Sequence, residues 1–230
     1  MVIDDAERTL YKVAVRAPFE HADVARWATL WPFGGYERWL AELAGAPSLD
    51  VDQLAGILGT DVEFHVHAGK LAAGLDASDV DGSYAECCVR KSVPTRTDNL
   101  HDLLNALTWA RFPLAKHALC VRQVQQARAR GVVDGRRVRS REQDTCAMLD
   151  EGGMVLGPNH HAVFGHAALE DTVRGRDVRP FLVHVDTDDL DVGLARLLLN
   201  PQPLPRVRER HAVLSAIRLA VGEATIDQLS

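Results

Sequence analysis

The chain has 230 residues, 47% of them hydrophobic, so it can bury the core of one large domain or two small ones. Its formal net charge of -6 excludes an overall positive field that would draw it to nucleic acid or to an anionic membrane. No apolar run approaches the roughly 20 residues that span a bilayer, and the chain begins with acidic residues where a signal peptide needs basic ones, so we expect a cytoplasmic protein with no membrane partner.

The sequence predicts a single globular domain, because it contains no repeat, no low-complexity tract and no linker long enough to separate two domains. We expect residues 1–26 to form an N-terminal arm and residues 27–230 to form the domain. Apolar residues at helical spacing predict a helix over Tyr36–Leu43. Apolar and polar residues alternate over Val62–His67, which predicts a strand.

The centre of the sequence predicts two helices in tandem. Leucines recur at positions i, i+3, i+4 and i+7 from residue 100, and either Asp98 or Asn99 can cap the helix that carries them. Pro113 ends this helix, because the residue before a proline avoids helical angles. Proline is also favoured at the first position of a helix, so Pro113 can open a second one that runs to about Ala129.

Two interpretations remain open for residues 146–156, where apolar runs flank a pair of glycines. The pattern indicates a hairpin turn, or a short helix that ends at Gly152. The remaining elements follow from apolar spacing: helices over 160–173, 192–199 and 211–221, and a strand over 180–185. Together these elements predict a helix-dominated α+β fold, a single compact domain with a few short strands.

One face of the first central helix is polar. At 100° per residue, His101, Asn105 and Thr108 lie together opposite the leucines, with Asp102 and Trp109 beside them. Such a face is often simply solvated. A large aromatic side chain among polar groups instead indicates that the face is covered, so a functional site or a buried polar network is the alternative interpretation.

Further polar residues have spacings that suit chemistry. His166 and Glu170 lie one helical turn apart, so they can converge on one metal ion or one substrate, or form an ordinary surface hydrogen bond. Asp144, with Asp150 and Glu151, supplies carboxylates for a hard cation or for acid/base catalysis. Turns also favour aspartate, so a purely structural role for these carboxylates is the alternative.

Seven arginines lie between residues 122 and 141, which makes a basic patch in an acidic protein. The patch could bind phosphate through bidentate contacts, or it could pair with the acidic stretch over residues 186–191. The sequence has no Walker loop, Rossmann glycine fingerprint, Gly-x-Ser-x-Gly elbow or His-Glu-x-x-His motif, which disfavours the common nucleotide-binding and serine-hydrolase classes. The four cysteines form no Cys-x-x-Cys pair, which argues against a zinc ribbon.

The string from His101 to Lys116 resembles the bacterial family called domain of unknown function 3025. That family's hallmark is His-Asp-x-x-Asn-Ala-x-x-Trp-x-x-Phe-Pro-x-x-Lys, and every fixed position of it is present here. Other shared pieces follow in the family's order: Tyr84 with Glu86, Pro94-Thr95-Arg96, Asp144-Thr145, Asp150-Glu151-Gly152, and Gly165-His166 with Glu170. The resemblance covers roughly Trp27 to Val185. The chain departs from the family pattern at Leu100, where a tryptophan is usual, and directly after Lys116.

The resemblance implies no established activity, but it singles out a set of shared polar residues: His101, Asp102, Asn105, Asp144, Glu151, His166 and Glu170. Shared polar groups on a leucine-backed helix suit a site better than a solvated face.

Our leading hypothesis is a hydrolase that uses a divalent metal ion such as zinc, manganese or magnesium. The predicted ligands are His101, Asp102, His166 and Glu170. Asp144 or Glu151 would be the acid/base, because a metal-bound water needs a carboxylate to accept its proton, and Asn105 is counted with this catalytic group. A small anionic substrate, for example a phosphorylated one, would be bound by Arg96, Lys116, Arg136 and Arg137.

Two other hypotheses remain open. The chain could be a non-catalytic binding or regulatory module that uses the arginine patch for nucleic acid or an acidic partner. Alternatively, His101, Asp102 and Asn105 could form a buried hydrogen-bond network that fixes the loops near residues 95–96 and 150–151.

Overall fold

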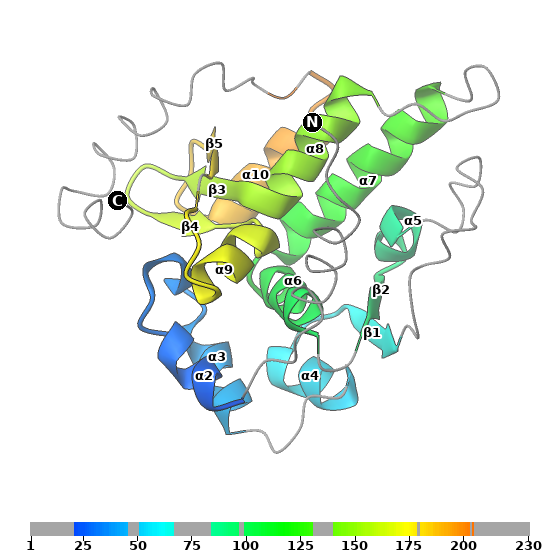
Figure 1. The fold of residues 1–230 in the computed structure, drawn as a ribbon. Helices are drawn as coiled ribbons and strands as arrows, with labels where there is room; N and C mark the ends of the chain where they lie inside the picture. The colour runs from blue at the N-terminus through cyan, green and yellow to red at the C-terminus, as the bar shows by residue number, and fades with distance from the viewer. Residues whose placement is uncertain are drawn as a thin grey trace, which may run out of the picture.

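The computed structural model of the protein describes residues 21–45, 51–66, 84–96, 99–130, 140–178, 180–202 and 204 (Figure 1). Over these residues the fold is α+β and dominated by helices, with a few short strands, as the sequence predicts. Residues 1–20 of the predicted arm, the predicted helix over 211–221 and the arginine-rich residues 131–139 lie outside the described residues. None of the described helices is both long and apolar enough to cross a membrane.

The first half of the described chain consists mostly of short helices. Its elements are α2 (His21–Trp27), the 3-10 helix η1 (Trp31–Phe33), α3 (Glu37–Ala44), α4 (Val51–Leu58), β1 (Glu63–Val66), α5 (Tyr84–Val89) and β2 (Ser92–Thr95). The predicted helix over Tyr36–Leu43 and the predicted strand over Val62–His67 are confirmed as α3 and β1. Residues 21–26, which the sequence assigned to the arm, belong to α2, where Val24 is fully buried.

The two predicted central helices are present as α6 (Leu100–Arg111) and α7 (Pro113–Arg130). Asn99 is the N-cap of α6, because its side chain accepts a hydrogen bond from the backbone N–H of Asp102. The leucines of α6 are buried in the core. Trp109 and Thr108 on the predicted polar face are also fully buried, so this face is covered by protein, and the interpretation of a solvated face is wrong there.

The second half of the described chain contains α8 (Arg141–Gly152), β3 (Gly153–Leu156), β4 (His161–Val163), α9 (His166–Val173), β5 (Phe181–His184) and α10 (Leu190–Leu199). Asp191 of α10 caps α7, since its carboxylate accepts hydrogen bonds from the backbone N–H groups of Leu114 at 3.2 Å and Ala115 at 2.8 Å. These hydrogen bonds hold the start of α10 against the start of α7, which lies 76 residues earlier in the sequence.

The strands form two small sheets. β1 and β2 pair in parallel, and a second sheet has the order β4-β3-β5, with β3 antiparallel to β4 and parallel to β5. Of the two interpretations of residues 146–156, the helix that ends at Gly152 is confirmed. The predicted helix over 160–173 is wrong for residues 161–163, because these pair with β3 as a strand; helix α9 starts only at His166.

Gly165 brings the start of α9 against the end of α8. A Cβ atom on Gly165 would lie 2.4 Å from the backbone nitrogen of Gly153 and 2.5 Å from the carbonyl oxygen of Glu151, so no larger residue fits without moving the backbone. α9 packs on α6 as well as on α8 (Figure 1). The N-terminus of α9 therefore meets residues from both helices.

Candidate metal centre

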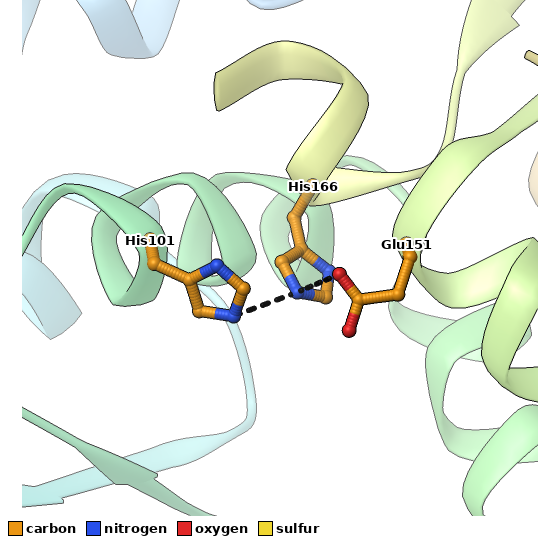
Figure 2. Close-up of side chains that lie close together, drawn as sticks. All are labelled: His101, Glu151 and His166. Atoms are coloured by element: carbon orange, nitrogen blue, oxygen red, sulfur yellow. Dashed lines mark hydrogen bonds and ion pairs between the residues drawn. The ribbon is translucent and has the colours of Figure 1, made fainter. Parts of the chain in front are cut away.

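Three potential metal-binding side chains meet at this junction. His101 lies on α6, Glu151 near the end of α8 and His166 at the start of α9, and Figure 2 shows the three side chains turned toward one another. One ligand atom from each of them lies within 4.8 Å of the others. Two imidazole nitrogens and one carboxylate are a donor set that proteins use for zinc and other transition metals.

The two histidines make the closest approach. The Nε2 atoms of His101 and His166 are 3.0 Å apart, and the rings stand nearly perpendicular at 82°. Glu151 Oε2 lies 3.6 Å from His166 Nε2. The three side chains are also graded in exposure, with 5% of His166, 29% of His101 and 54% of Glu151 accessible to solvent. His166 is therefore the most buried of the three side chains, and Glu151 lies on the side of the group that faces solvent.

Glu170 orients His101. Its Oε2 atom lies 3.0 Å from His101 Nδ1, and its Oε1 atom accepts a hydrogen bond from Arg174 Nε at 2.9 Å. A proton on Nδ1 leaves the lone pair of His101 on Nε2, which faces His166 and Glu151. Histidine ligands of metals commonly donate their other N–H to a carboxylate in this way. Glu170 was predicted as a ligand, but the structure places it behind His101 instead.

Burial and neighbouring charges set the protonation of the group. Burial lowers the pKa of His166 to about 3, so this imidazole is neutral at physiological pH and keeps a lone pair for binding. Burial also acts to lower the pKa of His101, but the hydrogen bond that His101 donates to Glu170 and the charge of Glu151 outweigh it and raise that pKa. Burial and the charge of Asp150 raise the pKa of Glu151.

Glu170 is ionised for a different reason. Its burial would raise the pKa, but the hydrogen bond with His101 and the charge of Arg174 hold that pKa below the usual value. The carboxylate that orients His101 is therefore charged at neutral pH, which favours a proton on Nδ1 of that histidine.

A second polar network lies next to the first, around a buried lysine. Lys116 is only 1% exposed, and its Nζ atom donates to Asp150 Oδ1 at 2.5 Å and to Asn105 Oδ1 at 2.7 Å. Asn105 in turn donates to the Tyr84 hydroxyl at 2.6 Å. Asp150 directly precedes Glu151 on α8, so the two networks share that helix end. Lys116, predicted to bind substrate, and Asn105, predicted to be catalytic, are thus bonded to protein groups.

Asp102 does not join the three donors either. Its carboxylate accepts hydrogen bonds from the backbone N–H of Arg96 at 2.7 Å and from the Arg96 Nε and NH2 groups, both at 2.8 Å. This bidentate pair fixes the end of β2 against α6. Arg96, predicted to bind substrate, keeps 40% of its side chain exposed while it holds Asp102.

The remaining predicted residues lie elsewhere. Asp144 is exposed in the first turn of α8, seven residues before Glu151 and therefore about two helical turns from the group. Arg136 and Arg137 lie outside the described residues, so the hypothesis of an arginine patch that binds nucleic acid or an acidic partner stays a prediction. Arg122, counted with that patch, is 4% exposed and donates to Glu142 and to backbone carbonyls in the last turn of α10 and just beyond it.

Sequence reasoning missed Arg174, and it did not predict that Lys116 pairs with Asp150. Arg174 could have been found from its spacing of four residues after Glu170 on one helix. The pairing of Lys116 with Asp150 has no such signal, because the two residues lie on different helices 34 residues apart.

In the ionisation state that metal binding requires, with every carboxylate charged and both histidines neutral, the described residues around the group carry an excess of negative charge. Its carboxylates are Asp102, Asp150, Glu151 and Glu170, and its cations are Arg96, Lys116 and Arg174. With both histidines neutral, one negative charge is left over, which favours a bound cation.

The fold and the site thus define a helix-dominated α+β protein with a two-histidine, one-carboxylate group that could hold a metal ion. A family model described as "Protein of unknown function (DUF3025)" matches residues 75–171, a segment that contains all three donors and Glu170. Over these residues the match confirms the family resemblance predicted from the sequence. No curated protein and no solved structure matches the chain.

Proposed function

We propose that the protein is a metal-dependent hydrolase in which His101, His166 and Glu151 bind one divalent metal ion. The observation that carries the proposal is the contact between Glu170 and His101. His101 is a partly buried histidine whose Nδ1 is held by a carboxylate 3.0 Å away and whose Nε2 faces a second histidine, also 3.0 Å away. This is the arrangement of a metal ligand with its supporting carboxylate.

The number of ligands favours catalysis over a structural role. Structural zinc sites are closed by four protein ligands, whereas catalytic sites have three and leave a position for water or substrate. Three donors are present among the described residues, and the exposed side of the group is at Glu151. Solvent and substrate can therefore approach from that side.

The donor set also bears on the metal and the substrate. Imidazole nitrogen is a poor ligand for magnesium and a good one for zinc, so zinc is the favoured ion of the three considered. A divalent ion would change the local excess from one negative to one positive charge, which suits a small anionic substrate. Bound zinc would lower the pKa of a coordinated water to about 7 and so would supply a nucleophile at neutral pH.

The roles proposed for this chain's residues follow from their positions. His166 and His101 bind the ion from the buried side, Glu170 orients His101, and Glu151 completes the set from the open side. Glu151 is thus proposed as a ligand. The acid/base role of Asp144 and substrate binding by Arg96 stay predictions.

The test is metal binding followed by hydrolysis. The purified full chain, stripped with a chelator and titrated with zinc, should bind close to one equivalent, and His101→Ala should lose this binding while retaining its circular dichroism spectrum. His117→Ala is the matched control, because His117 is a partly buried histidine that bonds to the carbonyl of Val89 outside the group.

Hydrolysis is then measured on the zinc-loaded protein with p-nitrophenyl phosphate and p-nitrophenyl acetate. We expect turnover by the wild type and by His117→Ala, and none by His101→Ala. Failure of the wild type to bind zinc, cobalt or manganese would refute the metal site. Stoichiometric binding without turnover of any ester or phosphoester would refute the hydrolase.

A further inference from the structure

The two ring nitrogens of His166 have different surroundings. Its Nε2 atom faces His101 and Glu151, whereas its Nδ1 atom is buried and has no hydrogen-bond partner among the described residues. His101 differs, since its Nδ1 is held by Glu170. Buried polar atoms are nearly always hydrogen-bonded, so an orphaned nitrogen on a candidate ligand calls for an explanation.

Metal binding would make this nitrogen a donor. If both Nε2 atoms bind a metal ion, each must offer a lone pair, so the proton of neutral His166 has to lie on Nδ1. An N–H group in that buried position needs an acceptor, because an unsatisfied buried donor is costly. The loaded site therefore requires an acceptor behind His166, as Glu170 already stands behind His101.

Asp150 is the acceptor that the surroundings offer. Glu170 is engaged by His101 and Arg174. Asp150 uses Oδ1 for Lys116, and no described residue donates to its Oδ2. Asp150 directly precedes Glu151, whose carboxylate lies 3.6 Å from His166 Nε2, and the backbone at Gly165, next to His166, packs against this end of α8. Asp150 therefore lies at the same junction of α8 and α9 as the ring.

Lys116 holds Asp150 much as Arg174 holds Glu170. The lysine is almost fully buried and is itself fixed by Asn105, so it keeps the carboxylate charged and in place. Each histidine would then be oriented by a carboxylate that is itself held by a basic side chain. For His101 these are Glu170 and Arg174, and for His166 they are Asp150 and Lys116.

We propose that Asp150, held by Lys116, is a positioning residue for His166 and accepts its Nδ1–H when the metal is bound, directly or through one water molecule. This inference rests on the proposed metal site and adds a role for the buried lysine and aspartate. It also accounts for the burial of Lys116, whose hydrogen bonds to protein groups leave it unavailable to bind substrate.

Cobalt titration of the chelator-stripped full chain, followed by its visible absorption spectrum, tests the proposal. Removing a supporting partner of a metal ligand weakens binding by about 10- to 100-fold. We expect a loss of that size in Asp150→Asn. Asp191→Asn is the matched control: it alters another buried carboxylate, on α10 at the start of α7, and should lower the melting temperature but leave cobalt affinity within about twofold of wild type.

Asp150→Asn leaves Lys116 buried without its ion-pair partner, so this variant could fail to fold. The double variant D150N/K116M removes both charges and should show the same loss of cobalt affinity. Nuclear magnetic resonance of the zinc-loaded wild type should show a slowly exchanging Nδ1–H of His166 that exchanges rapidly in the double variant.

Wild-type cobalt affinity in folded Asp150→Asn or in the double variant would overturn the inference while leaving the metal site intact. If the wild-type protein binds neither cobalt nor zinc, the proposed function is refuted, and this inference, which depends on it, is refuted as well.

Discussion

The carboxylate of Glu170, which orients His101, gives the sharpest prediction. Glu170→Gln keeps the size of the side chain but replaces the charged carboxylate, which lies 3.0 Å from His101 Nδ1 and 2.9 Å from Arg174 Nε. The amide has only one oxygen for these two donors. The imidazole of His101 therefore loses the fixed, charged partner that places its lone pair on Nε2.

The magnitude follows from the geometry. Removing the carboxylate partner of a metal-binding histidine costs about 10- to 100-fold in affinity, which corresponds to about 1.4–2.8 kcal/mol of binding free energy at about 1.4 kcal/mol per factor of ten. Stability should fall as well, by about 1–3 kcal/mol, because Arg174 loses a largely buried charged acceptor.

Competition with a chromophoric chelator at pH 7 measures the zinc affinity, and urea unfolding of the metal-free protein measures stability. Glu142→Gln is the matched control. Glu142 also pairs with an arginine, Arg122, and is also mostly buried, but it contacts no histidine of the group. We expect both variants to lose stability and only Glu170→Gln to lose zinc affinity.

Equal zinc affinity in wild type and Glu170→Gln would refute the argument that Glu170 orients a ligand. Equal losses of affinity in Glu170→Gln and Glu142→Gln would refute it too, because the effect would then follow from general destabilisation.

Two further predictions concern the scaffold. Burial, opposed in part by Arg111, raises the pKa of Tyr36 well above its usual value, so the stabilisation from the neutral phenol is present below pH ~10 and is lost as pH rises above it, by up to about 1.4 kcal/mol per pH unit. Tyr36→Phe removes the 2.7 Å hydrogen bond to the Val163 carbonyl and should lower the free energy of unfolding by about 1–3 kcal/mol at pH 7. Between pH 10 and 12, urea unfolding should show that this free energy falls less steeply with pH in the variant than in wild type. An equal slope in both proteins would contradict this. Gly165→Ala places a methyl group 2.4 Å from the backbone nitrogen of Gly153, so it should cost about 1–3 kcal/mol and weaken zinc binding by shifting His166; wild-type values in thermal unfolding and in the zinc assay would contradict the close approach.

Much of the local structure followed from the sequence for local reasons. Cap residues and prolines act on their own helix, so Asn99 and Pro113 marked the boundaries of α6 and α7. Helical spacing also placed His101 and Asn105 on the face opposite the leucines, and the indole of Trp109 indicated that this face is covered. The prediction failed at residues 161–163, because their strand depends on pairing with β3, which is a long-range contact.

The membership of the site was decided by tertiary structure. The sequence indicated His101 and His166, but it could not rank the carboxylates, because helical spacing fixes which residues share a face and not which helix end they meet. A spacing of one helical turn from His166 predicts Glu170 as a ligand, yet its carboxylate contacts Nδ1 of His101, on the side of the ring away from the group. Glu151 reaches the histidines because Gly165 lets the backbone of α9 touch the end of α8.

The sequence by itself determined the kinds of donor and the helices that carry them, because composition and periodicity are properties of neighbouring residues. Only the packing of α6, α8 and α9 decided which atoms face one another, which carboxylate supports a histidine, and that Lys116 is buried. Those outcomes depend on contacts between segments as much as 69 residues apart, such as that of His101 with Glu170, and no local pattern encodes them.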